Sequence, residues 1–271
     1  MNGSLRFIGN ATTLIRFNGF TLLTDPNFLH QGQRAYLGYG LTSRRRTNPA
    51  VELEDLPTVD AVVLSHLHGD HFDRVARKGL DRDTPIITTK HAARRLRWRG
   101  FGQCVGLDPW QDHELRGAGG SVKITALPAK HAPSPIEGLL PPTIGTMLEF
   151  SGRDERVELR LHISGDTLLD RRLDAIPRRF PEIDLALVHL GGTKLLGTVM
   201  VTMDGEQGAS WVDLINPHAV VPVHYDDYTV FTSPLDDFRH HIEQAGLSDR
   251  VVYLKPGESR ELAPHRLIRR I

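Results

Sequence analysis

Runs of apolar residues predict a chain in which short strands and helices follow one another throughout. The predicted strands cover residues 5–8, 11–17, 20–24, 61–64, 85–89, 121–129, 146–150, 157–163, 184–190, 219–223, 250–254 and 259–262. The predicted helices cover residues 72–78, 91–99, 168–176, 206–215 and 234–244. Asn18-Gly19, between the second and third strands, predicts a tight β-hairpin. Strands and helices mix along both halves, so we expect one α/β domain over residues 1–271, with two sheets and helices outside them.

Residues 27–58 show little periodicity, and Gly, Pro and Arg are frequent among them. A long irregular loop in a compact domain is usually functional or mobile. Arg44, Arg45 and Arg46 follow one another in this stretch. The simpler interpretation of the triplet is a solvated turn, and the sharper one is an anion-binding part of a substrate rim.

Metal-binding side chains follow the apolar strand at 61–64. His66, His68, Asp70 and His71 fall within six consecutive positions. A helix would distribute these side chains around a cylinder, whereas a turn at a strand end can gather them round one point. Imidazole and carboxylate are the ligands that divalent transition metals prefer. The segment therefore predicts a metal-binding turn.

Three further strand ends carry the same kinds of side chain. His131, Asp166 and His224 each follow a run that should lie in the core. If the strands are aligned, their ends converge on one edge and complete a set of five imidazoles and two carboxylates. We expect no catalytic role for the histidines outside this pattern, which are His30, His113, His240, His241 and His265.

Composition narrows the classes of protein that fit. The chain has 271 residues, of which 39% are hydrophobic, so it can build a substantial core. Lys+Arg and Asp+Glu are both 33, and this balance makes nucleic acid or an anionic membrane an unexpected partner. The sequence shows no signal peptide and no run of about 20 apolar residues that would span a membrane. Together with the single cysteine, Cys104, these features predict a cytoplasmic protein.

Residues 66–71 match a His-x-His-x-Asp-His signature, and through it the chain resembles the metallo-β-lactamase superfamily. Residues 9–15 and 23–26 resemble the opening of the branch that includes ascorbate-6-phosphate lactonase and the N-acyl-phosphatidylethanolamine phospholipase D-like proteins. Residues 164–167 and 221–225 resemble the family's bridging-aspartate segment and last ligand strand. The resemblance implies a four-layer αββα sandwich, two mixed β-sheets flanked by helices, with the site at one edge.

The same resemblance implies two divalent metal ions that share one carboxylate. The ligands of the first metal would be His66, His68 and His131. Those of the second would be Asp70, His71 and His224, and Asp166 would bridge the two ions. On ligand type, Zn is the first choice, and Mn, Fe and Ni accept the same set.

The ligand chemistry indicates hydrolysis. A metal lowers the pKa of bound water to about 7, so that hydroxide is available at neutral pH. Asp70, with a free carboxylate oxygen, is the candidate catalytic residue that accepts or returns a proton. Asp25 and Asn27 either orient ligand histidines or form a turn with Pro26.

The residues around the candidate site describe a substrate only in outline. Loops 132–144 and 191–203 are unusually apolar, and they either line a pocket or pack against a second subunit of a homo-oligomer. Lys194 either meets an anionic group or is solvated, and His189 ends its strand and is predicted to face the cavity. Tyr225 and Asp226 directly follow the last ligand, and we include them among the residues that support a ligand or contact substrate.

The function that these observations favour is a metal-dependent hydrolase with a dinuclear site. Metal-bound hydroxide would attack an ester, lactone or phosphoester of a small molecule. One alternative is a nuclease of the same fold, which the balanced charge opposes. It is supported only by two arginine clusters, residues 44–46 and the four arginines within the predicted helix at 91–99. A third is a non-catalytic metal-binding regulatory protein, which the complete set of seven ligands disfavours.

Overall fold

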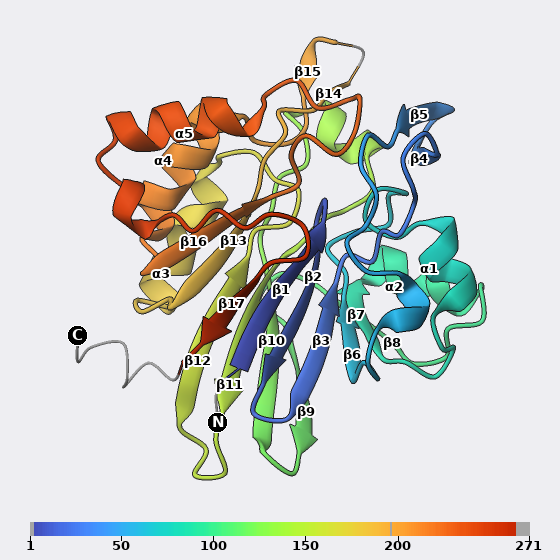
Figure 1. Cartoon of the computed structure of the whole chain (residues 1–271), viewed down its shortest axis with the longest axis vertical. Coiled ribbons are helices and arrows are strands. Elements are labelled where there is room, and N and C mark those ends of the chain that lie inside the picture. The colour runs from blue at the N-terminus through green and yellow to red at the C-terminus, as the bar shows by residue number, and fades with distance from the viewer. Residues whose placement is uncertain (1–2, 196, 264–271) are drawn as a thin grey trace.

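The computed structural model describes residues 3–195 and 197–263, which form two β-sheets packed face to face (Figure 1). The first sheet contains, in spatial order, β17 (Ser259–Leu262), β1 (Gly3–Gly9), β2 (Thr12–Phe17), β3 (Phe20–Thr24), β6 (Ala61–Val63), β7 (Ile86–Thr89) and β8 (Cys104–Leu107). The second contains β16 (Ala219–Val223), β13 (Leu185–His189), β12 (Val157–Ile163), β11 (Gly145–Ser151), β10 (Gly120–Leu127) and β9 (Asp112–Gly117). Both sheets are mixed, since antiparallel pairs precede parallel ones in each.

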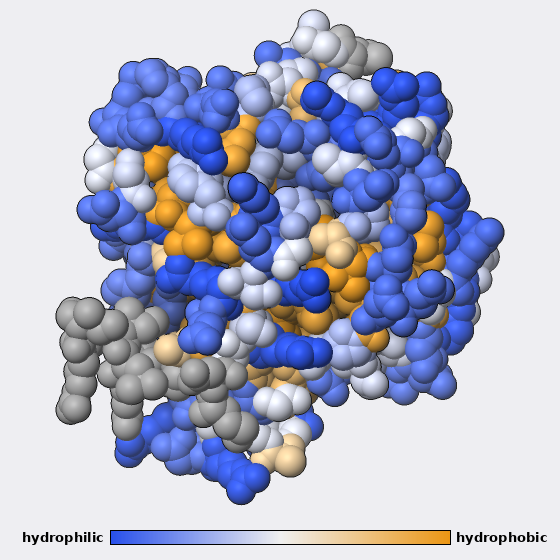
Figure 2. Space-filling view, in the orientation of Figure 1, coloured by the Kyte–Doolittle hydropathy of each residue, from blue (hydrophilic) through white to orange (hydrophobic). Residues whose placement is uncertain are grey.

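Helices cover the outer face of each sheet, which confirms the expected αββα sandwich (Figure 1). The first sheet carries α1 (Arg74–Gly79) and α2 (Lys90–Arg97). The second carries α3 (Ala175–Arg179), α4 (Gly205–Ile215) and α5 (Leu235–Gln244). Among the described residues, no helix is both long and apolar enough to cross a membrane. Figure 2 shows hydrophilic side chains over α5 and over the upper right of the same view, with apolar patches between them.

Strands buried on both faces supply the core. In β13, Leu185 and Leu187 face the other sheet, whereas Ala186 and Val188 face the helices. This period of two explains why the central strands appear in the sequence as continuous apolar runs. The predicted hairpin is also confirmed, because Asn18 and Gly19 have φ values of 49° and 84° and join β2 directly to β3.

Two expected elements are wrong, and two strands of the sheets were not expected. No single α-helix covers residues 168–176, because the Asp170 carboxylate accepts a hydrogen bond from the Arg172 N–H and starts a 3-10 turn, η3 (Arg171–Asp174), and the short α3 begins only at Ala175. Residues 250–254 form only a single bridge, between Val251 and Val220, after η4 (Ser248–Arg250). Strands β8 and β9 were not expected. The edge strand β9 is charged and largely exposed, so it lacks an apolar alternation.

The stretch from 27 to 58 is also more ordered than expected. It contains a hairpin, β4 (Arg34–Gly38) and β5 (Leu41–Arg44), and a 3-10 turn, η1 (Leu53–Asp55). Arg44 and Arg46 are exposed, as a solvated turn requires. Both interpretations are wrong for Arg45, whose side chain is fully buried 3.6 Å from the Asp227 carboxylate and over the Tyr228 ring. A side chain's tertiary partners, which no local pattern encodes, decide this burial.

Candidate metal centre

The turn after β6 brings four candidate ligands to one point. The N–H groups of His71 and Phe72 both donate to the His68 carbonyl, at 3.2 and 2.8 Å, which closes the turn. Asp73 then caps α1, because its carboxylate accepts a hydrogen bond from the Ala76 N–H. His66, Asp70 and His71 are buried, and the ring of His68 is partly exposed.

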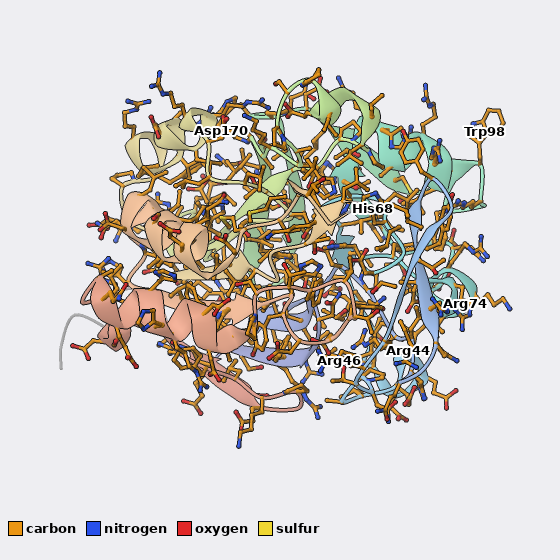
Figure 3. All side chains as sticks on the ribbon, turned by 90° about the horizontal axis from the view of Figure 1, so that it is seen from above. Arg44, Arg46, His68, Arg74, Trp98 and Asp170 are labelled. Carbon is orange, nitrogen blue, oxygen red and sulfur yellow. The ribbon has the colours of Figure 1, made fainter. Side chains whose placement is uncertain are left out.

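Three imidazoles converge at one end of the site. His66 Nε2 lies 2.9 Å from His68 Nδ1, and His68 Nδ1 lies 3.4 Å from His131 Nε2. His131 arrives from the loop after β10, and its ring lies 4.8 Å from that of His66. We call these three residues the imidazole group. Figure 3 shows His68 well inside the outline of the molecule.

Asp70, His71 and His224 converge beside them, and we call these the acid group. His224 Nε2 lies 3.5 Å and His71 Nε2 4.0 Å from Asp70 Oδ2. Asp166 lies between the groups, since its Oδ2 is 3.2 Å from His71 Nε2 and 3.8 Å from His66 Nε2. The structure thus brings all seven predicted ligands together at the carboxyl edge of β6, β12 and β16.

Outer hydrogen bonds orient the rings so that ligand nitrogens face inward. His131 Nδ1 and His224 Nδ1 lie 3.0 and 3.1 Å from the carbonyls of Val201 and Leu190. A carbonyl only accepts, so each Nδ1 carries the proton and each Nε2 offers its lone pair to the centre. His71 Nδ1 lies 3.0 Å from Asp25 in the same way. Converging lone pairs with no donor between them fit a cation, and these residues therefore suit divalent metal ions.

The two groups differ in electrostatic character. Burial, followed by the neighbouring imidazoles, lowers the pKa of His68 to about 3 and that of His66 well below its ordinary value. Burial acts in the same direction on His71 and His224, but Asp166 and the other nearby carboxylates outweigh it and raise the pKa of both. The surroundings of the imidazole group therefore favour neutral rings, whereas those of the acid group favour protonated rings, whose protons a metal would have to displace.

Asp25 and His189 are buried residues that support the ligands. Asp25 accepts hydrogen bonds from the backbone N–H of Ser65 at 2.7 Å and from its hydroxyl at 2.9 Å. Although burial opposes it, the neighbouring His71 and His189 lower the pKa of Asp25 to about 2. His189 is buried and lies 3.4 Å from Asp25 and 3.2 Å from the Ser164 hydroxyl, and its ring stacks on that of His71.

Asn27 supports the turn by a different route from the one considered in the sequence. Its side-chain amide donates to the Gly69 carbonyl at 3.0 Å, not to a histidine, and its oxygen accepts the Tyr228 hydroxyl at 2.9 Å. Of the two residues after the last ligand, Tyr225 packs against Phe7 and the helical layer, and Asp226 is exposed. Neither lines the cavity beside the ligands.

Residues that sequence reasoning missed hold the two ligand turns together. Asn10 donates from its side chain to the Asp70 carbonyl at 2.7 Å and accepts the His224 N–H at 2.8 Å. Asp227 accepts the Asn10 N–H at 3.0 Å and pairs with Arg45. The left-handed φ values of Asn10 and His224, 53° and 61°, turn the chain so that these contacts form. Asn after Gly9 was the one available signal, since Asn tolerates this conformation.

Gly69 lets the β4–β5 hairpin dock on the metal turn. The Gly69 N–H donates to the Tyr36 carbonyl at 2.9 Å. A Cβ at this position would lie 2.6 Å from that oxygen and 2.7 Å from the Tyr36 nitrogen. Glycine is therefore required by close backbone approach.

A cavity of about 170 Å³ opens beside the ligands. His68, Asp70, His131 and Asp166 line it with Lys194 and apolar side chains. The apolar residues of the lining are Leu37, Leu41, Leu140, Leu195, Val201 and Val230. His131 and Leu140 also line a larger cleft of about 830 Å³. The two apolar loops noted in the sequence thus line cavities next to the candidate ligands.

A sandwich of this topology with a histidine–aspartate centre at one edge defines a protein of the metallo-β-lactamase fold. Comparison with known proteins agrees. Residues 21–225 match the family described as Beta-lactamase superfamily domain, and the chain belongs to it. It is 33% identical over 260 residues to a UPF0173 metal-dependent hydrolase of Deinococcus radiodurans, covering 95% of this chain and 99% of the relative. The protein is accordingly a metal-dependent hydrolase.

Solved structures support the fold. An isothiocyanate hydrolase from Delia radicum gut bacteria aligns with a TM-score of 0.80 and 22% identity, covering 96% of this chain and 99% of that one. Igni18, a metallo hydrolase from Ignicoccus hospitalis, aligns with a TM-score of 0.71 and 22% identity, covering 97% and 99%. These descriptions name neither a lactonase nor a phospholipase, so the narrower resemblance stays a prediction.

Proposed function

We propose that this hydrolase uses two divalent metal ions to cleave an ester, lactone or phosphoester of a small molecule. The observation that carries the proposal is the pair of ligand groups joined by Asp166, whose Oδ2 lies within 4 Å of a nitrogen from each. A carboxylate placed between two sets of inward-facing ligands suits a pair of ions. Zn is the first choice on ligand type, and Mn, Fe and Ni suit the same donors.

The protein's own residues have distinct roles in this proposal. Divalent metals held by these residues would make hydroxide available at neutral pH, because such ions lower the pKa of water to about 7. Asp70 Oδ1 is buried and has no hydrogen-bond partner among the described residues, so this oxygen is free to accept a proton. Asp25 holds the His71 ring, and Asn10 and Asn27 hold the backbone of residues 69–70. Leu140 and Val201 exclude water from one side of the cavity.

The cavities favour a small-molecule substrate. The 170 Å³ space beside the ligands holds a reacting group, and the adjoining cleft of about 830 Å³ is within the range of small-molecule sites. Lys194 stands at the cavity, where it would meet an anionic group of the substrate. A cytoplasmic location and a homo-oligomeric state remain predictions.

A hydrolysis panel on the metal-loaded protein tests the proposal. The panel contains generic esters, lactones, phosphodiesters and an isothiocyanate, and metal content is measured in the same samples. We expect turnover of at least one oxygen ester and two metals per chain, and His68→Ala should lose turnover and the metal of the imidazole group. His113→Ala, which changes a histidine on β9 outside the site, is the matched control and should keep both. A protein that holds two metals and hydrolyses none of these would favour the regulatory alternative.

A further inference from the structure

A separate cavity of about 220 Å³ lies against the metal turn and is lined by four arginines, Arg34, Arg74, Arg77 and Arg99. Leu67, His68 and Gly69 form part of its wall. His68 also lines the cavity beside the metal ligands, so one ring borders both spaces. In Figure 3, Arg74 lies toward the outside of the molecule and His68 further in. The arginine cavity therefore adjoins the candidate metal centre but is distinct from it.

The positive charge of this cavity is not balanced by carboxylates. Within residues 3–195 and 197–263, none of the four arginines forms an ion pair with an acidic side chain. Asp73 is the acidic residue in the lining, but its oxygens accept the backbone N–H groups of Phe28, Leu29 and Ala76. Asp73 is thus engaged in holding the backbone and capping α1.

The arginines also repel one another. Partial burial, followed by the charges of Arg77 and Arg95, lowers the pKa of Arg99. Like charges that crowd without counter-ions destabilise a folded protein, unless a ligand compensates them. The segment that contains three of these arginines, residues 74–99, also has an excess of positive charge. It contains nine Lys or Arg and two Asp in a chain of zero net charge.

His68 also borders the arginine cavity. His68 Nδ1 faces the imidazole group, and its Nε2 is buried without a hydrogen-bond partner among the described residues. An anion in the cavity would meet several guanidinium groups at once.

We propose that the arginine cavity binds a phosphate-type anion, the phosphate or diphosphate group of a small compound. Guanidinium groups match phosphate oxygens with paired hydrogen bonds, and several of them favour a multiply charged anion over a single carboxylate. A volume of about 220 Å³ suits a phosphate group rather than a whole drug-sized molecule. The site lies outside the metal cavity, so this inference goes beyond the proposed hydrolytic function and does not depend on it.

Pyrophosphate binding to the metal-loaded protein, measured by calorimetry and by thermal unfolding, tests the proposal. The test variant is Arg77→Gln with Arg99→Gln, since neither side chain has a hydrogen bond or ion pair to lose among the described residues. The control is Lys78→Gln with Arg94→Gln, which removes the same charge from exposed positions of α1 and α2 outside the cavity. We expect at least a tenfold loss of affinity in the test variant and less than threefold in the control. Without pyrophosphate, the test variant should unfold at the same or a higher temperature.

Several outcomes would overturn the proposal. Equal losses of affinity in both variants would show that pyrophosphate is attracted to the basic residues of this segment in general and not to the cavity. Binding that persists in the test variant but disappears after chelation would place the anion on the metals. Tighter binding of a short RNA than of pyrophosphate, with a strong salt dependence, would show a nucleic-acid surface instead. Because each readout is binding, failure of the hydrolysis panel would leave this test unaffected.

Discussion

The imidazole group and the acid group lie side by side, yet they differ in charge and in support. His66, His68 and His131 are kept neutral by burial and by one another. His71 and His224 lie among the carboxylates of Asp25, Asp70 and Asp166, which raise their pKa. The acid group also receives the longest-range supports, from Asn10 and through it from Asp227. If the centre holds two ions as proposed, this difference predicts two metal sites of unlike affinity and unlike pH dependence.

Replacing the residue that joins the groups should have the largest effect. Asp166→Ala removes an oxygen that lies close to both His66 and His71, so the two groups lose the carboxylate between them. Replacing residues behind metal ligands costs roughly 10–100-fold in metal affinity or activity, so we expect a loss beyond about 100-fold here. Metal analysis and turnover measure it. Asp170→Ala, whose carboxylate pairs with Lys130 and Arg172 and not with a candidate ligand, is the control. Full metal content in Asp166→Ala would contradict the bridging role.

Breaking the buried pair behind the acid group should mainly affect stability. Arg45→Met leaves the Asp227 carboxylate buried and without its cation. Removing one partner of such a pair costs about 3–5 kcal/mol of the free energy of unfolding, measurable by denaturant titration. Arg46→Met, at an exposed neighbour, should stay within about 0.5 kcal/mol. Because Asp227 holds Asn10, the Arg45→Met protein that still folds should bind metal more weakly at the acid group. Its affinity at the imidazole group should be unchanged. Equal falls in both would refute this distinction.

Asp25→Asn tests support at a single ligand. The substitution keeps the shape of the side chain but weakens its hold on His71 Nδ1 at 3.0 Å. We expect a loss of roughly 10–100-fold in metal affinity, confined to the acid group. Competition with a metal-binding dye measures it. Asp60→Asn, which alters an exposed carboxylate bonded to the Thr21 N–H, should bind metals as the wild type does. A loss in the imidazole group would mean that Asp25 acts on the whole turn.

The smallest expected effect is a difference between the two groups in the pH dependence of metal binding. The raised pKa of His71 and His224 means that both bind protons more readily than free imidazole, so metal affinity at the acid group should fall as pH falls. Each displaced proton contributes about tenfold for each unit of pH below the pKa concerned. The imidazole group, with His68 at about 3, has no proton to displace at pH 6–8 and should show little change. His131→Ala and His224→Ala isolate the acid and imidazole groups for equilibrium dialysis, and equal slopes would contradict the comparison.

The predictable part of the site was the set of residues whose role is visible in the sequence immediately around them. The four ligands at 66–71 lie in one turn, and the strands before His131, Asp166 and His224 are apolar runs that must be buried, so their ends converge. The helix expected at 168–176 was wrong because the Asp170 side chain competes for the backbone. The hairpin at 34–44 was missed because it lies outside both sheets, where no alternating burial is required.

The sequence by itself determined the chemistry of the centre and the order of its ligands, because imidazole, carboxylate and strand periodicity are properties of neighbouring residues. Only the tertiary structure decided which nitrogen of each ring faces inward and which residues hold the ligand turns. Asn10 reaches Asp227 across 217 positions, and Tyr228 reaches Asn27 across 201. The tertiary structure also buries one of three adjacent arginines and places four others around a cavity. These placements depend on packing between distant segments, which no window of sequence contains.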